Sequence, residues 1–170
     1  MNGEAVLITG ASGSGKSSLT AALSLRGRPV LGDDIVLLGP DGHVSPLKRL
    51  LKIEEPARTL LGLPHAPEPQ ATLWPGAAFY HPRDLRSRWA DPAPVAAFVL
   101  PRRTAGADVG ARERSPADIL PEVLQGVIAS ERPTSVEADA AIEALSGARA
   151  IELVYDDSAQ GAARLLEELS

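Results

Sequence analysis

A glycine-rich turn near the amino end constrains the fold of this chain more than any other feature. The stretch GASGSGKS, residues 10–17, has the spacing G-x-x-x-x-G-K-S and directly follows the apolar run AVLIT, Ala5–Thr9. A short apolar run bounded by glycine predicts a strand that is buried on both faces. After the glycines, apolar residues recur at i, i+3 and i+4, which predicts a helix over Ser17–Arg26. The order strand, turn, helix favours an α/β fold.

The same turn has the chemistry of a phosphate site. Glycines allow successive main-chain N–H groups to point inward around a pyrophosphate, and the positive end of the following helix faces that anion. We therefore expect Lys16 to reach the β- and γ-phosphates of ATP and the Ser17 hydroxyl to bind Mg²⁺. The expected nucleotide contacts are Gly10, Ala11, Ser12, Gly13, Ser14, Gly15, Lys16, Ser17 and Ser18.

Two acidic pairs are candidates for the catalytic carboxylate that phosphoryl transfer requires. Asp33 and Asp34 follow the stretch PVLG, 29–32, which predicts a second strand. Since a strand–turn–helix–strand unit returns the chain beside its first strand, we expect both carboxylates next to the phosphate site. A solvated turn before a hairpin is the alternative interpretation. The other pair, Asp156 and Asp157, is interpreted as the start of the last helix.

The remaining sequence predicts further strands and helices within one domain. Length and the absence of an evident linker or repeat favour a single domain over residues 1–170, with a mixed central sheet flanked by helices. The expected elements are a hairpin over 35–45, helices over Glu54–Leu61, Ala117–Ala129, Ser135–Leu145 and Ala159–Leu169, strands over 72–74, Pro94–Leu100 and 150–155, and a helical turn over 82–88.

Composition excludes several classes of function. The net charge of −5 gives no reason to expect nucleic acid as a partner. The absence of cysteine excludes disulfides and thiolate metal sites. The apolar runs are shorter than a membrane span, and the amino end has no signal-peptide pattern. We therefore expect a cytoplasmic protein without a membrane partner.

Residues 7–34, LITGASGSGKSSLTAALSLRGRPVLGDD, resemble the catalytic domain of HPr kinase/phosphorylase and its shorter bacterial relatives. The shared run is a strand, G-x-S-G-x-G-K-S, a helix ending in Arg-Gly, a short strand and Asp-Asp. Looser similarity extends to FYHPRDL, AAFVLPRR and IELVYDD. The resemblance implies a P-loop kinase that transfers the γ-phosphate of ATP to a serine of a protein or peptide, HPr or a similar acceptor, and that assembles as a homo-oligomer.

The resemblance also implies roles for the paired acids. One carboxylate of the pair acts in the family as the base on the acceptor hydroxyl, a role that falls here on Asp33 or Asp34, and the other orients the metal or substrate. Ser17 and Asp34 are the metal ligands that we expect. The chain departs from the family at Lys52, which stands where a metal-binding glutamate aligns, with Glu54 or Glu55 as the alternative residue for that role. Residues 1–9 also contain no histidine to match the one that the family carries upstream of the glycine turn. These departures argue against phosphorolysis and leave the acceptor open.

An arginine-rich segment without periodicity, residues 102–114, follows the strand predicted over Pro94–Leu100. Its arginines are interpreted either as a lid that neutralises the transferring phosphoryl group or as a solvated loop. Arg102 and Arg103, closest to the strand end, are the best candidates for such a role, and Arg103 completes the expected catalytic set with Lys16, Asp33 and Asp34. His81 is interpreted as a structural histidine, with replacement of the missing family histidine as the alternative.

Two other functions stay open. The first is a small-molecule kinase similar to shikimate kinase, although enzymes of that type usually carry Asp-x-Asp where this chain has adjacent acids. The second is a nucleotide-binding regulator whose catalytic residues have been lost, which the change at Lys52 keeps open.

Overall fold

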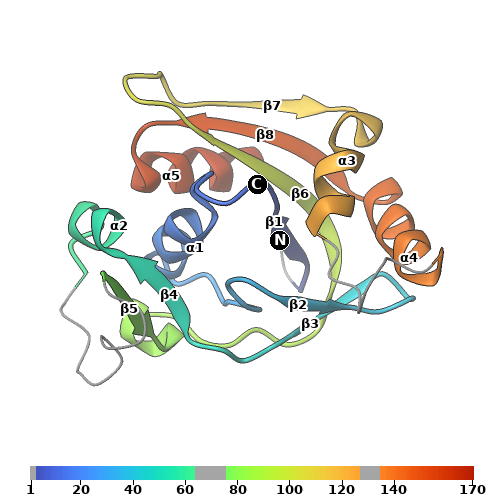
Figure 1. Ribbon diagram of the computed structural model, residues 1–170, viewed down its shortest axis with the longest axis horizontal. Coiled ribbons are helices and arrows are strands. Elements are labelled where there is room, and N and C mark those ends of the chain that lie inside the picture. The colour runs from blue at the N-terminus through green and yellow to red at the C-terminus, as the bar shows by residue number, and fades with distance from the viewer. Residues whose placement is uncertain (1–2, 64–75, 127–134) are drawn as a thin grey trace.

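The computed structural model describes residues 3–63, 76–126 and 135–170, and within them it has a mixed α/β architecture (Figure 1). A six-stranded mixed sheet contains β1 (Ala5–Ile8), β2 (Val36–Leu38), β3 (His43–Pro46), β6 (Ala93–Arg103), β7 (Gly110–Arg114) and β8 (Arg149–Tyr155). A second sheet pairs β4 (Leu51–Glu54) with β5 (Ala77–Tyr80). The helices in these residues are α1 (Lys16–Leu25), α2 (Glu55–Leu60), α3 (Pro116–Gly126), α4 (Ser135–Ser146), α5 (Ser158–Glu168) and the 3₁₀ turn η2 (Pro82–Leu85).

Strand β6 organises the larger sheet, because it pairs with three neighbours. It runs parallel to β1 and β8, and its first residues pair antiparallel with β3. Strand β7 lies antiparallel to β8, and β2 forms a hairpin with β3. The parallel strands β1, β6 and β8 therefore end at one edge of the sheet, where the glycine turn follows β1.

Alternate residues of β6 and β8 pack against helices on the two faces of the sheet. Phe98 and Leu100 of β6 join one buried cluster with α3 and α4, whereas Ala97 and Val99 join the other with α1 and α5. Figure 1 shows these two helix pairs on opposite sides of the strands. The result is a three-layer arrangement with an apolar core on each side of the sheet.

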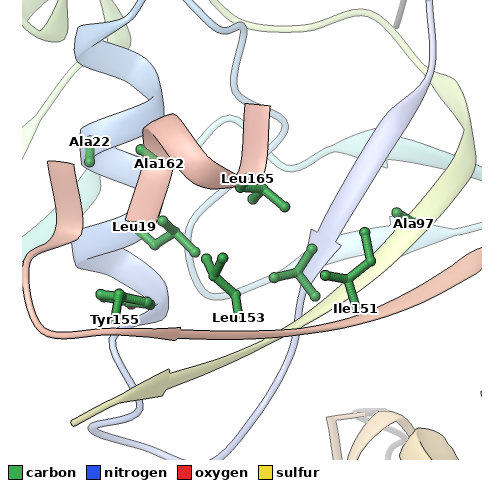
Figure 2. Close-up of a cluster of buried hydrophobic side chains, with 9 residues drawn as sticks. Leu19, Ala22, Ala97, Ile151, Leu153, Tyr155, Ala162 and Leu165 are labelled. Carbon is green, nitrogen blue, oxygen red and sulfur yellow. The ribbon is translucent and has the colours of Figure 1, made fainter. Parts of the chain in front are cut away.

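The core between the sheet and the helix pair α1–α5 supports the glycine turn (Figure 2). Leu19 of α1, Leu153 of β8 and Leu165 of α5 meet in this cluster and are almost completely buried. Tyr155, the last residue of β8, is also completely buried and lies at the end of the cluster nearest the start of α1. Helix α1, and with it the end of the glycine turn, is thus fixed against the last strand and helix of the chain.

Most of the expected elements are confirmed, with boundaries that shift by a few residues. The hairpin over 35–45 is β2–β3, and the helices expected at Ser17–Arg26, Glu54–Leu61, Ser135–Leu145 and Ala159–Leu169 are α1, α2, α4 and α5. The helix expected over Ala117–Ala129 is α3, whose described part ends at Gly126. The strand expected over 72–74 lies outside the described residues.

The second strand expected at 29–32 is wrong. Only Val30 makes a bridge, and its partner is Trp89, through the Val30 N–H to Arg88 O (2.9 Å) and the Ala90 N–H to Val30 O (2.8 Å). Strand β1 pairs with β6 instead. Pro29 has no N–H to donate to a neighbouring strand, and only two residues lie between it and Gly32. This run is too short to form a ladder of hydrogen bonds.

Two further expectations are corrected. Strand β1 is not buried on both faces: Ala5 is buried, but the other three residues are half-buried, because they line a cavity. The arginine-rich segment is not an irregular loop, since β6 extends to Arg103 and residues Gly110–Arg114 form β7. No helix in the described ranges combines the length and the apolar character needed to cross a membrane.

Candidate functional site

The glycine turn leads directly into the amino end of α1. Gly15 is the residue that precedes the helix, and its φ of 100° and ψ of 10° place it in the left-handed region that favours glycine. No side chain of the described residues caps this helix end. The first-turn N–H groups of a helix have no intrahelical partner, so this uncapped end has the polarity of an anion site.

Tyr155 forms the floor of the turn. Its buried hydroxyl donates a hydrogen bond to the Gly15 carbonyl oxygen (3.2 Å), and a side chain at Gly15 would collide with that hydroxyl. Gly161 of α5 makes room for the ring, because a Cβ there would lie 2.8 Å from Tyr155 Cγ. Burial raises the pKa of Tyr155 to about 12, although nearby Arg103 and Ser158 lower it in part. The phenol therefore stays protonated as a donor at neutral pH.

Lys16 crosses the inside of the turn. Its ammonium group donates hydrogen bonds to the carbonyl oxygens of Gly10 and Ala11, each 2.9 Å long. Beside it, Ser14 Oγ is buried and has no hydrogen-bond partner among the described residues. The turn where the sequence predicts phosphate thus contains both a positive charge and, among the described residues, a buried hydroxyl without a partner.

Asp33 lies beside the glycine turn, although no second strand carries it there. Its Oδ2 accepts a hydrogen bond from the Lys52 N–H (3.0 Å) at the edge of β4. Its Oδ1 is buried and has no hydrogen-bond partner of ordinary geometry in the described part of the chain. Burial raises the pKa of Asp33 and the Asp34 charge adds to this, while the Ser17 hydroxyl, the Lys52 N–H and the Lys16 charge lower it. Lys16, Ser17 and Asp33 are therefore neighbours.

The Asp33–Asp34 pair forms a wall between two cavities. The first has a volume of about 790 Å³ and is lined by Gly10, Lys16 and apolar residues of β1. The second has a volume of about 220 Å³ and is lined by Arg49, Lys52 and Phe79, among others. Both cavities include Asp33, Asp34 and Ile35 in their walls. Asp34 is exposed, so its carboxylate is the more accessible of the pair.

Of the arginines at the end of β6, Arg103 lies beside the glycine turn. It donates from Nε to the Asp156 carbonyl oxygen (3.1 Å), and its charge lowers the pKa of Tyr155. Arg102 instead pairs with Glu122 of α3 at 3.6 Å. The turn after β6 is closed by Asp156, whose Oδ2 accepts a hydrogen bond from the Gly106 N–H (2.9 Å).

The lid interpretation does not hold for Arg112 and Arg114. Both pair with Glu152 of β8, Arg112 at 2.8 Å and Arg114 at 2.6 Å. Arg114 also contacts Asp118 of α3 at 3.5 Å. These two arginines neutralise a buried carboxylate on the sheet, and that requirement explains why arginines alternate along β7.

Other candidate residues have structural contacts. His81 lies in a network in which Trp89 Nε1 is 3.2 Å from its Nε2 and Arg83 N is 3.1 Å from its Nδ1. Asp157 caps α5 by accepting a hydrogen bond from the Gln160 N–H (2.9 Å), as expected. The glutamates of the 50–55 stretch line neither cavity: Glu54 pairs with Lys52 at 3.6 Å, and Glu55 pairs with Arg58 at 2.7 Å.

Sequence reasoning did not identify Tyr155 or Arg49 as part of the site. Tyr155 belongs to no motif, and its position near the turn follows from the parallel pairing of β8 with β6, which the sequence did not predict. Arg49 precedes β4, a strand that the weak periodicity of this region did not reveal.

Comparisons with known proteins return no relative: no protein-family model, no curated protein and no solved structure matches the chain. The functional interpretation therefore depends on the geometry of the site and on the resemblance of residues 7–34.

Proposed function

We propose that the protein is a P-loop kinase-like phosphotransferase that moves the γ-phosphate of ATP to a hydroxyl group, with a serine of a protein or peptide as the acceptor, in the manner of HPr kinase. The observation that carries the proposal is the proximity of Asp33 to Lys16 and Ser17, on a cavity wall that the glycine turn also lines. That proximity joins an anion site to a carboxylate, which phosphoryl transfer requires.

The nucleotide phosphates are held by residues 10–18. Lys16 exchanges its bonds to the carbonyl oxygens of Gly10 and Ala11 for bonds to phosphate oxygens, which are stronger because both partners are charged. The uncapped N–H groups at the start of α1 add further donors. Ser14 Oγ, buried without a partner among the described residues, gains one when the turn holds phosphate.

Ser17 and Asp33 would hold Mg²⁺. Asp33 has a buried oxygen, Oδ1, without a hydrogen-bond partner in the described ranges, and Mg²⁺ prefers hydroxyl, carboxylate and phosphate oxygens as ligands. Bound there, the ion would neutralise phosphate charge and favour the ionised form of Asp33, opposing the effect of burial. This assignment gives the metal to Asp33, whereas the sequence had suggested Asp34.

Asp34 is then the base. Its exposed carboxylate borders both cavities, so it can accept the proton of a hydroxyl that faces the nucleotide. In the reaction, the acceptor oxygen bonds to the γ-phosphorus, the bond to the β–γ bridging oxygen breaks, ADP leaves, and the hydroxyl proton passes to Asp34. Arg103, beside the turn, stabilises the charge on the transferring group.

Nucleotide binding is tested by calorimetry with Mg²⁺·ATP. We expect Lys16→Ala to abolish binding or transfer, and Lys48→Ala, an exposed lysine outside both cavities, to leave binding unchanged. Absence of ATP and GTP binding by the unmodified protein would refute the proposal.

Transfer is tested with labelled ATP alone, with cell extract and with small hydroxylated metabolites. A labelled protein band supports the proposal, a labelled metabolite supports a small-molecule kinase, and binding without transfer supports a regulator. Asp33→Asn/Asp34→Asn should retain nucleotide binding but lower transfer by on the order of 10²–10⁴ if general base catalysis is lost. Unchanged turnover in this double variant would remove the assigned base.

A further inference from the structure

The smaller cavity is lined by two acids and two cations. Asp33 and Asp34 form the wall shared with the nucleotide cavity, and Arg49 and Lys52 line it as well. Its volume of about 220 Å³ is below the roughly 300 Å³ at which pockets begin to enclose a whole drug-sized ligand. The cavity therefore suits one small charged part of an acceptor.

The sheet β4–β5 fixes one of these cations. Lys52 pairs across the ladder with Phe79, so both side chains lie on one face. The adjacent pair, Leu51 and Tyr80, lies on the opposite face, which is buried. The Lys52 main chain is anchored at the wall itself, because its N–H donates to Asp33 Oδ2 (3.0 Å). The main chain of Lys52 thus lies directly beside Asp33.

The second cation, Arg49, is exposed and precedes β4. Among the residues that the structure describes, no carboxylate pairs with Arg49, in contrast to Arg58, which pairs with Glu55 at 2.7 Å. A guanidinium group in a cavity wall favours an anionic group of the ligand, and repulsion from Asp33 and Asp34 in the same wall would keep that group close to Arg49.

From this arrangement, and on the basis of the proposed function, we propose that the acceptor carries a carboxylate close to its reacting hydroxyl and that Arg49 and Lys52 bind this carboxylate. The acids orient the acceptor by repulsion, so its hydroxyl points to Asp34 and its anionic group points away. A serine flanked by acidic residues in a peptide and a free hydroxy acid both present this chemistry.

The test compares four acceptors at saturating Mg²⁺·ATP: a serine peptide flanked by glutamates, the same peptide flanked by lysines, a neutral version, and free serine. We expect kcat/KM for the glutamate peptide to exceed that for the lysine peptide by about 10- to 100-fold, the range for hydrogen bonds to charged groups. Labelling of free serine without labelling of any peptide would overturn the peptide acceptor of the proposed function, and the inference would then require Arg49→Glu to lower the labelling of serine by a similar factor.

Two charge-reversal variants provide the decisive comparison. Arg49→Glu should reverse the preference between the two charged peptides, whereas Arg83→Glu, at an exposed arginine that lines neither cavity, should preserve it. Calorimetry with Mg²⁺·ATP shows that each variant is folded and loaded.

Equal use of all three peptides, or an unchanged preference in Arg49→Glu, overturns the inference and leaves the kinase proposal standing. Failure to label any acceptor, including proteins of a cell extract, while ATP binds, overturns both.

Discussion

The contact between Gly15 and Tyr155 can be tested by stability measurements that need no knowledge of the substrate. Gly15→Ala introduces a Cβ at a φ of 100°, which costs about 1–2 kcal/mol for an L-residue in the left-handed region. The same Cβ collides with the Tyr155 hydroxyl, and overpacking of this kind adds about 1–3 kcal/mol. We expect a total loss in the free energy of unfolding of about 2–5 kcal/mol.

Removal of the hydroxyl should relieve the collision but not the backbone strain. Tyr155→Phe loses the hydrogen bond to the Gly15 carbonyl, at a cost of about 1 kcal/mol. In that variant the nearest ring atom to the new Cβ is Cζ, at 3.5 Å, which is an ordinary van der Waals distance. Gly15→Ala should therefore cost only about 1–2 kcal/mol in the Tyr155→Phe background.

The assay is urea denaturation of the four proteins of the cycle in the absence of nucleotide. Gly13→Ala is the matched control, because Gly13 has a φ of 80° and nothing lies within 4 Å of its added Cβ. Gly13→Ala should lower the free energy of unfolding through backbone strain alone, by the same amount with and without Tyr155→Phe. Additive effects of Gly15→Ala and Tyr155→Phe within about 0.5 kcal/mol would refute the contact.

Three further predictions concern charges. Burial raises the pKa of Asp33, so ionisation of this carboxyl at neutral pH opposes folding. Asp33→Asn should therefore raise the free energy of unfolding at pH 7 in the absence of Mg²⁺ and nucleotide. Urea denaturation at lower pH should show that this gain disappears below about pH 4, where Asp33 is protonated in both the folded and the unfolded state. Arg103→Ala should lower phosphoryl transfer by about 10²-fold in the kinase assay, whereas Arg102→Ala, whose side chain pairs with α3, should not. Arg114→Met should destabilise the protein by about 3 kcal/mol in urea denaturation, because a buried carboxylate loses its closest partner, and the more exposed Arg112→Met by less than about 1 kcal/mol.

The local features of this fold could be predicted from the sequence because short-range physics determines them. Proline and glycine at the turn between β2 and β3 specify the hairpin, and a short polar side chain, Asp157, specifies the start of α5. Apolar periodicity was sufficient for α1. The glycine turn belongs to the same class, because its conformation depends on glycines within the motif.

Long-range pairing could not be predicted from the sequence. The assumption that the chain after α1 returns beside β1 was wrong, since β6 occupies that position. Asp33 nevertheless lies beside Ser17, held by the Lys52 N–H of a two-stranded sheet that has no clear periodicity. Asp33 is therefore close to the glycine turn, as expected, but a contact with β4 holds it there rather than the predicted second strand. The HPr-like acceptor, the homo-oligomer and the cytoplasmic location stay predictions.

The link between Gly15 and Tyr155 spans 140 positions, and this separation has a consequence for biosynthesis. On the ribosome, the glycine turn emerges early, but β8 and α5, which support it, are made more than a hundred residues later. A nascent chain thus displays the motif before it has the support beneath it. If nucleotide binds as proposed, and binds only the finished domain, it would stabilise that domain by mass action and would have no effect on the chain before β8 and α5 are made.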